Sequence, residues 1–278
     1  DLAHSHLTQL HQAAGRPERI VIAAPGNMTR EQLSLLLGIV QHLPFDIAGL
    51  VHRTAVLAAA SGLRQGIHIE LQLHQTVVTS FDTEQGTVHA RQSQTSPGLG
   101  WMAVQDRLAT TIAGLFVTQT RFDPLRTADG EQALYDTLPG LLMALSEQTE
   151  TRIAIAGYEA RITRDDLTVV GQRLAEQLAP LLQTECPILL EEPLTRLPGF
   201  DLRRPTHSIA SEAVAHLVME QLPILEQAPD ALTLRRQLPT SAKPAAGSPS
   251  VIDAGQETVV DLAAPPRRAT HVLKGHTA

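Results

Sequence analysis

Four polar side chains that could do chemistry alternate with apolar ones near the middle of the first half of the chain. His68, Glu70, Gln72 and His74 share one parity, and the residues between them are Ile or Leu. Because successive side chains of a strand point to opposite faces, the pattern predicts one strand over 67–76, continuing to Thr79. Four polar residues on one face, in a mostly apolar neighbourhood, suggest that this face borders a cleft. Imidazole and carboxylate groups there could ligate a metal or move protons.

Two kinds of site are considered for these residues. A metal site on the strand is disfavoured, because His68 and His74 are separated by about 20 Å along a strand. Glu191 and Glu192 could form an acid and base pair, although we favour loop carboxylates that hydrogen-bond Arg196 or Arg53. The sequence has no G-x-S-x-G elbow and no phosphate loop motif, and Gly98-Leu99-Gly100 alone is a weak signal.

Composition narrows the class of protein. The chain has 278 residues, a net charge of −7, 3% aromatic residues and one cysteine, Cys186. An acidic balance disfavours a nucleic-acid binder, and a single cysteine excludes an internal disulfide. No apolar run is long enough for a membrane span and no leader pattern is present, so we expect a cytoplasmic protein. Because the sequence begins at Asp1 rather than Met, we expect residues upstream.

The predicted elements alternate between helix and strand. The first part contains helices at 4–14, 29–42, 54–61 and 101–118 and strands at 19–24, 46–52, 67–79 and 87–92. The second contains helices at 131–148, interrupted at Pro139-Gly140, at 163–182 and at 208–221, with strands at 151–156, 158–162 and 187–190. Thr29 with Gln32 and Thr163 at a helix start are capping signals. Gly62 is expected to end the helix at 54–61, and Glu84-Gln85-Gly86 to form a hairpin turn. Residues 239–278, rich in Pro, Ala and Ser, are expected to be a disordered tail, and 269–274 could be a strand.

This order of elements, with the residues in it, resembles the nucleotide-binding domain of the 70-kDa heat-shock chaperones and, more distantly, actin. Residues 24–32 are similar to the family's V-P-A-x-F-x-x-x-Q segment, and 51–62 to I-N-E-P-T-A-A-A-x-A-Y-G. Residues 67–76 stand where the family has its D-x-G-G-G-T phosphate turn, and 98–100 where a second glycine loop precedes a long helix. Four further segments follow in family order, at 144–153, 162–167, 188–198 and 211–215.

The resemblance implies an α/β, actin-like (ribonuclease H-like) fold of two lobes, without the first phosphate hairpin of the first lobe. Residues 1–120 would form the rest of the first lobe and the start of the second. Residues 121–238 would form the remainder of the second lobe with its helical and small-sheet insert, and 239–278 the tail.

The residues at the family's nucleotide positions depart from its pattern. Gln72, Leu73 and His74 replace glycines that let backbone approach phosphate. Arg53, which cannot act as a base, replaces the catalytic glutamate. Glu191 and Glu192 replace the glycines of the adenosine loop, and carboxylates repel a polyphosphate. Pro139, Leu142 and Met143 replace polar residues of the adenine helix. The positions that keep some of the pattern are Glu70, Gly98, Gly100, Ser146 and Arg196.

These departures predict a degenerate chaperone-like protein that does not hydrolyse ATP and needs no cofactor. We expect it to act as a binding or scaffold module for a protein partner, and we expect it to bind neither nucleic acid nor a membrane. The alternative is a chaperone-type protein that binds ATP and Mg²⁺ at a site completed by residues upstream of Asp1. A third reading is an enzyme that uses Glu70, His74 and Glu191 on another small substrate. Side chains that fill the expected phosphate position would count against the last two.

Overall fold

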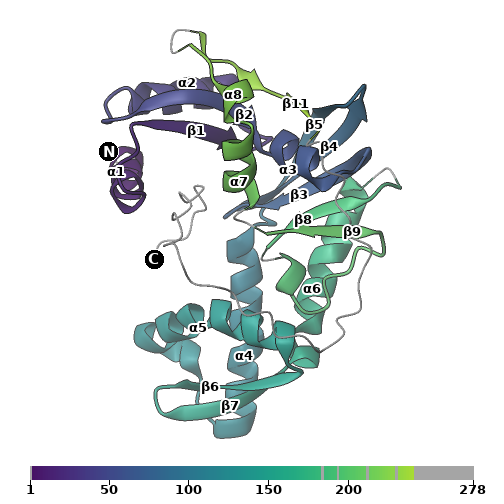
Figure 1. The fold of residues 1–278 in the computed structure, drawn as a ribbon. Coiled ribbons are helices and arrows are strands. Elements are labelled where there is room, and N and C mark those ends of the chain that lie inside the picture. The colour runs from purple at the N-terminus through teal and green to yellow at the C-terminus, as the bar shows by residue number, and fades with distance from the viewer. Residues whose placement is uncertain (1, 183–184, 193, 211–212, 229–230, 241–278) are drawn as a thin grey trace, which may run out of the picture. The chain divides into compact units, whose positions relative to one another are not determined.

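The computed structural model describes residues 2–182, 185–192, 194–210, 213–228 and 231–240, and they form an α/β structure (Figure 1). Contacts between residues divide the chain into two compact units that interleave along the sequence. The described part of unit 1 contains residues 2–64, 82–90, 213–228 and 231–240. That of unit 2 contains residues 65–81, 91–182, 185–192 and 194–210.

Unit 1 is built on a parallel sheet. Its elements are α1 (Leu2–Ala13), β1 (Arg19–Ala24), α2 (Arg30–Val40), β2 (Asp46–His52), α3 (Arg53–Ser61), α7 (Ala213–Glu220), α8 (Leu222–Leu225), β10 (Leu234–Arg235) and β11 (Gln237–Pro239). The strand order is β1-β2-β10, and both pairings are parallel. The central strand β2 is buried from Ile47 to His52, as expected for a parallel strand covered on both faces. Its side chains pack with those of α1 and α2 in one apolar cluster.

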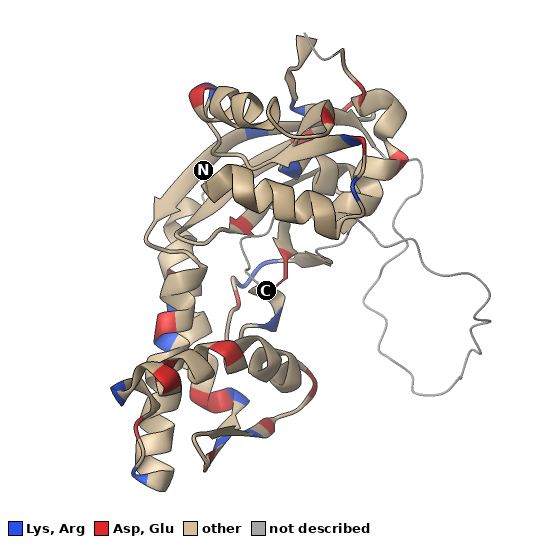
Figure 2. Cartoon of the chain, turned by 90° about the vertical axis from the view of Figure 1, so that its left-hand side faces the viewer, with Lys and Arg blue, Asp and Glu red and all other residues tan. Residues whose placement is uncertain are grey.

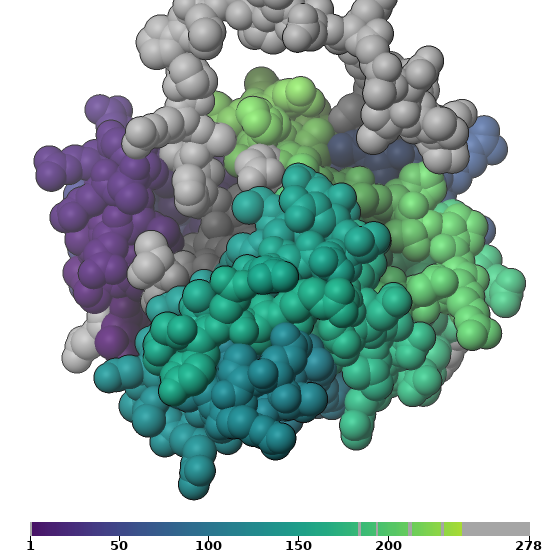
Figure 3. All heavy atoms as spheres, turned by 90° about the horizontal axis from the view of Figure 1, so that it is seen from below, coloured from purple at the N-terminus to yellow at the C-terminus, as the bar shows by residue number. Residues whose placement is uncertain are grey.

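Unit 2 contains the longest helices. Its elements are β3 (Gln65–Leu71), most of β4 (Gln75–Glu84) and β5 (Thr87–Pro97), α4 (Trp101–Thr120), α5 (Ala128–Glu147), β6 (Glu150–Ile155), β7 (Tyr158–Thr163), α6 (Arg164–Leu178), β8 (Ile188–Glu191), β9 (Thr206–Ile209) and 3₁₀ turns at Pro124–Arg126, Ala179–Leu181 and Leu194–Arg196. The strand order here is β5-β4-β3-β8-β9, and β6 pairs with β7. One apolar core joins α4, α5 and α6 to these strands, and residues of 101–163 form a continuous teal surface in Figure 3.

Several local predictions are confirmed. Thr29 and Gln32 form a capping box, in which the Gln32 amide donates to Thr29 Oγ1 at 3.2 Å and the Thr29 amide to Gln32 Oε1 at 2.9 Å. Thr163 caps α6 in the same way with Asp166. Gly62 ends α3 with a φ of 68°, which a glycine adopts without steric cost. Each of these signals depends on residues within about one helical turn, so each can be predicted from the sequence.

Three predicted elements are wrong. The strand expected over 67–79 is two strands, because the chain turns at residues 72–74 between β3 and β4. The helix α5 is not interrupted at Pro139-Gly140, because Leu138, Leu141 and Leu142 on either side of this exposed pair are buried in the core. The helix expected over 208–221 begins at Ala213, and 206–209 is strand β9; residues 211 and 212 lie outside the described residues. The expected tail, 239–278, lies outside the described residues except for Pro239, the last residue of strand β11, and Thr240.

Charged residues of both signs are interspersed along the described helices and strands, as Figure 2 shows. No helix among the residues that the structure describes is long and apolar enough to cross a membrane.

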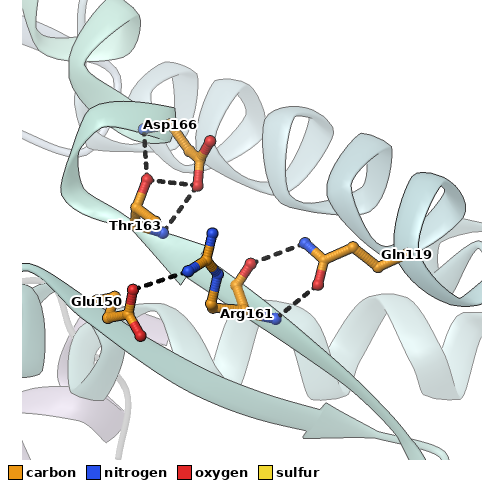
Figure 4. A network of polar contacts seen from close by, with 5 residues as sticks. All are labelled: Gln119, Glu150, Arg161, Thr163 and Asp166. Carbon is orange, nitrogen blue, oxygen red and sulfur yellow. Dashed lines mark hydrogen bonds and ion pairs between the residues drawn. The ribbon is translucent and has the colours of Figure 1, made fainter.

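The outer edge of β7 is closed by one side chain of α4 (Figure 4). The Gln119 amide donates to the Arg161 carbonyl at 2.8 Å and accepts from the Arg161 backbone N–H at 2.9 Å. Gln119→Ala should therefore lower the free energy of unfolding by about 1–2 kcal/mol, since each hydrogen bond contributes about 1 kcal/mol net. Denaturant unfolding measures the change. Gln132→Ala, which removes an exposed side-chain bond to Asp136 on α5, is the matched control and should change it by less than about 0.5 kcal/mol; equal effects of the two variants would contradict the edge-closing role.

Tyr135 of α5 donates a hydrogen bond to the Asp106 carboxylate of α4 at 2.7 Å. Burial and then this contact raise the pKa of Tyr135 to about 12. Because the pKa is raised only in the folded state, the folded protein favours the neutral Tyr135 side chain more than the unfolded chain does. The resulting contribution to stability is present below pH 10 and is lost as the pH rises from about 10 to 12. In a Tyr158→Phe background, which leaves Tyr135 as the only tyrosine, a tyrosinate absorbance titration should have its midpoint near 12.

Replacing Asp106 with Asn in the same background should lower the pKa of Tyr135 without returning it to 10, because burial is the larger cause. A midpoint at the ordinary tyrosine value in the parent protein would contradict the Tyr135–Asp106 contact.

Candidate functional site

The turn between β3 and β4 is the part of unit 2 where most predicted phosphate-site residues meet. The Gln72 backbone N–H donates to the Gln75 carbonyl at 2.9 Å and closes the turn. The Gln75 side-chain amide donates to Gln72 Oε1 at 2.9 Å, and the Gln72 amide in turn donates to Glu70 Oε1 at 3.1 Å. Glu70, the retained acid, is therefore already bound by a neighbouring side chain.

Helix α4 begins directly against this turn. The Trp101 N–H donates to the Gln72 carbonyl at 2.8 Å, and the Met102 N–H donates to the Leu73 carbonyl at 3.0 Å. The first amides of a helix have no partner within the helix and attract anions such as phosphate. Here two of them are occupied by backbone carbonyls of the same unit. The arrangement leaves those two amides with a protein acceptor in place of an anion.

The glycine loop before α4 is held to the same turn. Gly98 has a φ of 75° and donates its N–H to the His74 carbonyl at 2.9 Å, and the Thr76 hydroxyl donates to the Leu99 carbonyl. A Cβ at Gly100 would lie 2.3 Å from His74 C and 2.4 Å from both Gln75 N and Leu73 O. Gly100 is thus required by close packing of backbone on backbone within the protein.

His68 and Glu191 form a buried pair between neighbouring strands. His68 Nε2 lies 3.0 Å from Glu191 Oε1, and the two side chains are 1% and 6% exposed. The parallel register of β3 and β8 pairs His68 with Leu189, two residues before Glu191. The polar face of the 67–76 strand was expected to be solvated or hydrogen-bonded, and at His68 it is hydrogen-bonded and buried.

Glu192, the residue after Glu191, makes a different contact. Arg196 donates to Glu192 Oε1 at 2.9 Å across one turn, and both side chains are about one third exposed. This contact was predicted for the Glu191-Glu192 pair, whereas the bond between Glu191 and His68 was not. No sequence signal connects two strand residues that are so far apart along the chain.

The positions that the resemblance places on the adenine helix do not share one environment. Leu142 is 2% exposed and belongs to the apolar core of unit 2, whereas Met143 is 51% exposed. Ser146 donates its hydroxyl to the Met143 carbonyl at 2.6 Å within α5. Pro139 is exposed in the same helix. Leu142 is therefore not available to a ligand.

Arg53, in unit 1, is the first residue of α3 and is 5% exposed. The preceding His52 caps the helix by accepting the Thr54 N–H on its Nδ1 at 3.2 Å. A buried guanidinium at a helix start donates hydrogen bonds and cannot accept a proton.

The other histidines and the cysteine in the described part of the chain form no metal site. No group of three or more His, Cys, Asp or Glu side chains there could hold a metal ion. His74 is exposed while His68 is buried, so the two histidines of the predicted polar face are in different environments. Cys186 is buried, and this burial raises the pKa of its thiol, which disfavours a nucleophilic thiolate.

No protein-family model matches the chain, and no curated protein matches it significantly.

Proposed function

We propose that this chain is a degenerate relative of the chaperone and actin nucleotide-binding fold, which binds a protein partner and does not hydrolyse ATP. The observation that carries the proposal is the contact of Trp101 and Met102 amides with the carbonyls of Gln72 and Leu73. A phosphate at the start of α4 would have to displace both hydrogen bonds, and each unsatisfied backbone group would cost about 1–3 kcal/mol.

Side chains at the same turn support the proposal further. Glycine there would leave room for a phosphate, whereas Gln72 places a side-chain amide against Glu70. Glu70 would otherwise be the acid that approaches a magnesium ion. Glu191 is buried against His68, which disfavours the reading as an enzyme that uses Glu70, His74 and Glu191 together. The resemblance rests on an order of elements. In unit 2 that order is β3, β4, β5 and α4, followed by α5, β6, β7 and α6.

Calorimetric titration of the full chain with ATP and Mg²⁺ tests the nucleotide part of the proposal. We expect no saturable binding up to about 1 mM nucleotide, equivalent to a binding free energy weaker than about −4 kcal/mol, and no phosphate release above background. Adenosine and tripolyphosphate, titrated separately, distinguish the base from the phosphate contribution. Low-micromolar binding of ATP would overturn the proposal and favour the ATP-binding alternative.

A further inference from the structure

Strand β1 of unit 1 stands at the end of its sheet. It pairs with β2 through a parallel register from Arg19 opposite Asp46 to Ala24 opposite His52, and no described strand pairs with its other edge. Parallel sheets are normally covered, and an open edge presents a row of unpaired N–H and C=O groups. The side chains from Ile20 to Ala23 are only half-buried, so this strand is not fully covered by the rest of the unit.

A mostly apolar pocket of about 260 Å³ is lined by residues 19–23 of β1. Helix α1 contributes Leu7 and Leu10, the turn after it contributes Ala14, and helix α7 contributes Val218 and Met219. Figure 1 shows α1 and α7 near the two ends of β1. Met219 is 63% exposed although it lines the pocket. An edge strand beside an apolar pocket is the arrangement that accepts a further strand, with its backbone on the edge and alternate side chains in the pocket.

We propose that residues 257–262 of the same chain, Glu-Thr-Val-Val-Asp-Leu, are the segment that adds to β1. They lie outside the described residues, but the chain that leads to them leaves from unit 1. The Thr240 N–H donates to the Gly86 carbonyl at 2.9 Å, and β11 pairs with β5 just before it. Residues 241–256 can span about 50 Å, which exceeds the extent of a unit whose radius of gyration is about 14 Å.

The sequence of this segment fits the edge. Val259 and Val260 are β-branched, which favours a strand, and Thr258, Val260 and Leu262 fall on one parity. In a strand these three side chains point to the same face, where they would fill the apolar pocket. The inference concerns unit 1 and is independent of the proposed function.

Hydrogen exchange of the full-length chain tests this inference. In the wild type we expect slow exchange of the amides of β1. The double variant Val260→Asp/Leu262→Asp, which places charges in the pocket, should raise their exchange rate at least tenfold. Met219→Lys, at the exposed side of the pocket, should also raise the exchange rate of the β1 amides. The matched control Val272→Asp/Leu273→Asp adds the same charge elsewhere in the C-terminal residues and should leave exchange in β1 unchanged.

Exchange in α2 of unit 1 and in β6 and β7 of unit 2 shows whether each unit of a variant is folded, and it should be the same in all proteins. Equal exchange of β1 in the wild type and in Val260→Asp/Leu262→Asp would overturn the inference. So would protection of β1 that grows with protein concentration, because a second copy of the chain would then cover the edge.

Discussion

Gly100→Ala should lower the free energy of unfolding by about 3 kcal/mol or more, the range of severe packing defects. A Cβ at this position would lie 2.3–2.4 Å from backbone atoms of Leu73, His74 and Gln75. Backbone cannot swing aside as a flexible side chain can, so the turn must separate from the start of α4. The separation would break the bonds of the Trp101 and Met102 amides to Gln72 and Leu73.

Chemical denaturation followed by fluorescence measures this effect, because Trp101 is the only tryptophan and lies 5% exposed beside the turn. Gly114→Ala is the matched control in the same helix. Nothing lies within 4 Å of a Cβ at Gly114, so alanine there should stabilise α4 by about 0.5–1 kcal/mol. A Gly100→Ala protein as stable as the wild type would show that the turn and the helix are not packed as described.

Glu191→Ala should destabilise unit 2 by about 3 kcal/mol, because it removes one partner of a buried pair and leaves His68 without that acceptor. The neighbouring Glu192→Ala is the matched control. It removes a partly exposed ion pair with Arg196, which contributes less than about 1 kcal/mol. Thermal and denaturant unfolding of the two variants should therefore differ clearly.

A double-mutant cycle with His68→Ala isolates the contact itself. We expect a coupling energy of about 1–3 kcal/mol between His68 and Glu191, and less than about 0.5 kcal/mol between His68 and Glu192. Additive effects of His68→Ala and Glu191→Ala would contradict the pair.

Features that depend on residues close together in the sequence were predicted correctly. Capping boxes at Thr29 and Thr163 and the glycine at position 62 were predicted, because each depends on residues within one helical turn. The turn Gln85-Gly86 was predicted as well, and both residues have positive φ, as a tight hairpin turn requires.

Longer-range features could not be predicted in this way. The alternation of polar and apolar residues continues through Gln72, Leu73 and His74, so period alone does not separate a strand from a strand followed by a turn. What decides the turn is its contact with α4, almost thirty residues later in the chain. The pairing of His68 with Glu191 depends in the same way on the placement of β8 beside β3. Helix α5 continues through Pro139 because tertiary burial on either side of it outweighs local preference.

The central claim is that the first amides of α4 are held by the protein's own turn and are not available to a nucleotide. Amide NMR of the ¹⁵N-labelled chain during titration with ATP and Mg²⁺ tests it most directly. We predict that the Trp101 and Met102 amide signals exchange slowly with solvent and do not shift up to about 1 mM nucleotide, a limit of about −4 kcal/mol in binding free energy. Saturable shifts of both signals at micromolar ATP would contradict the claim.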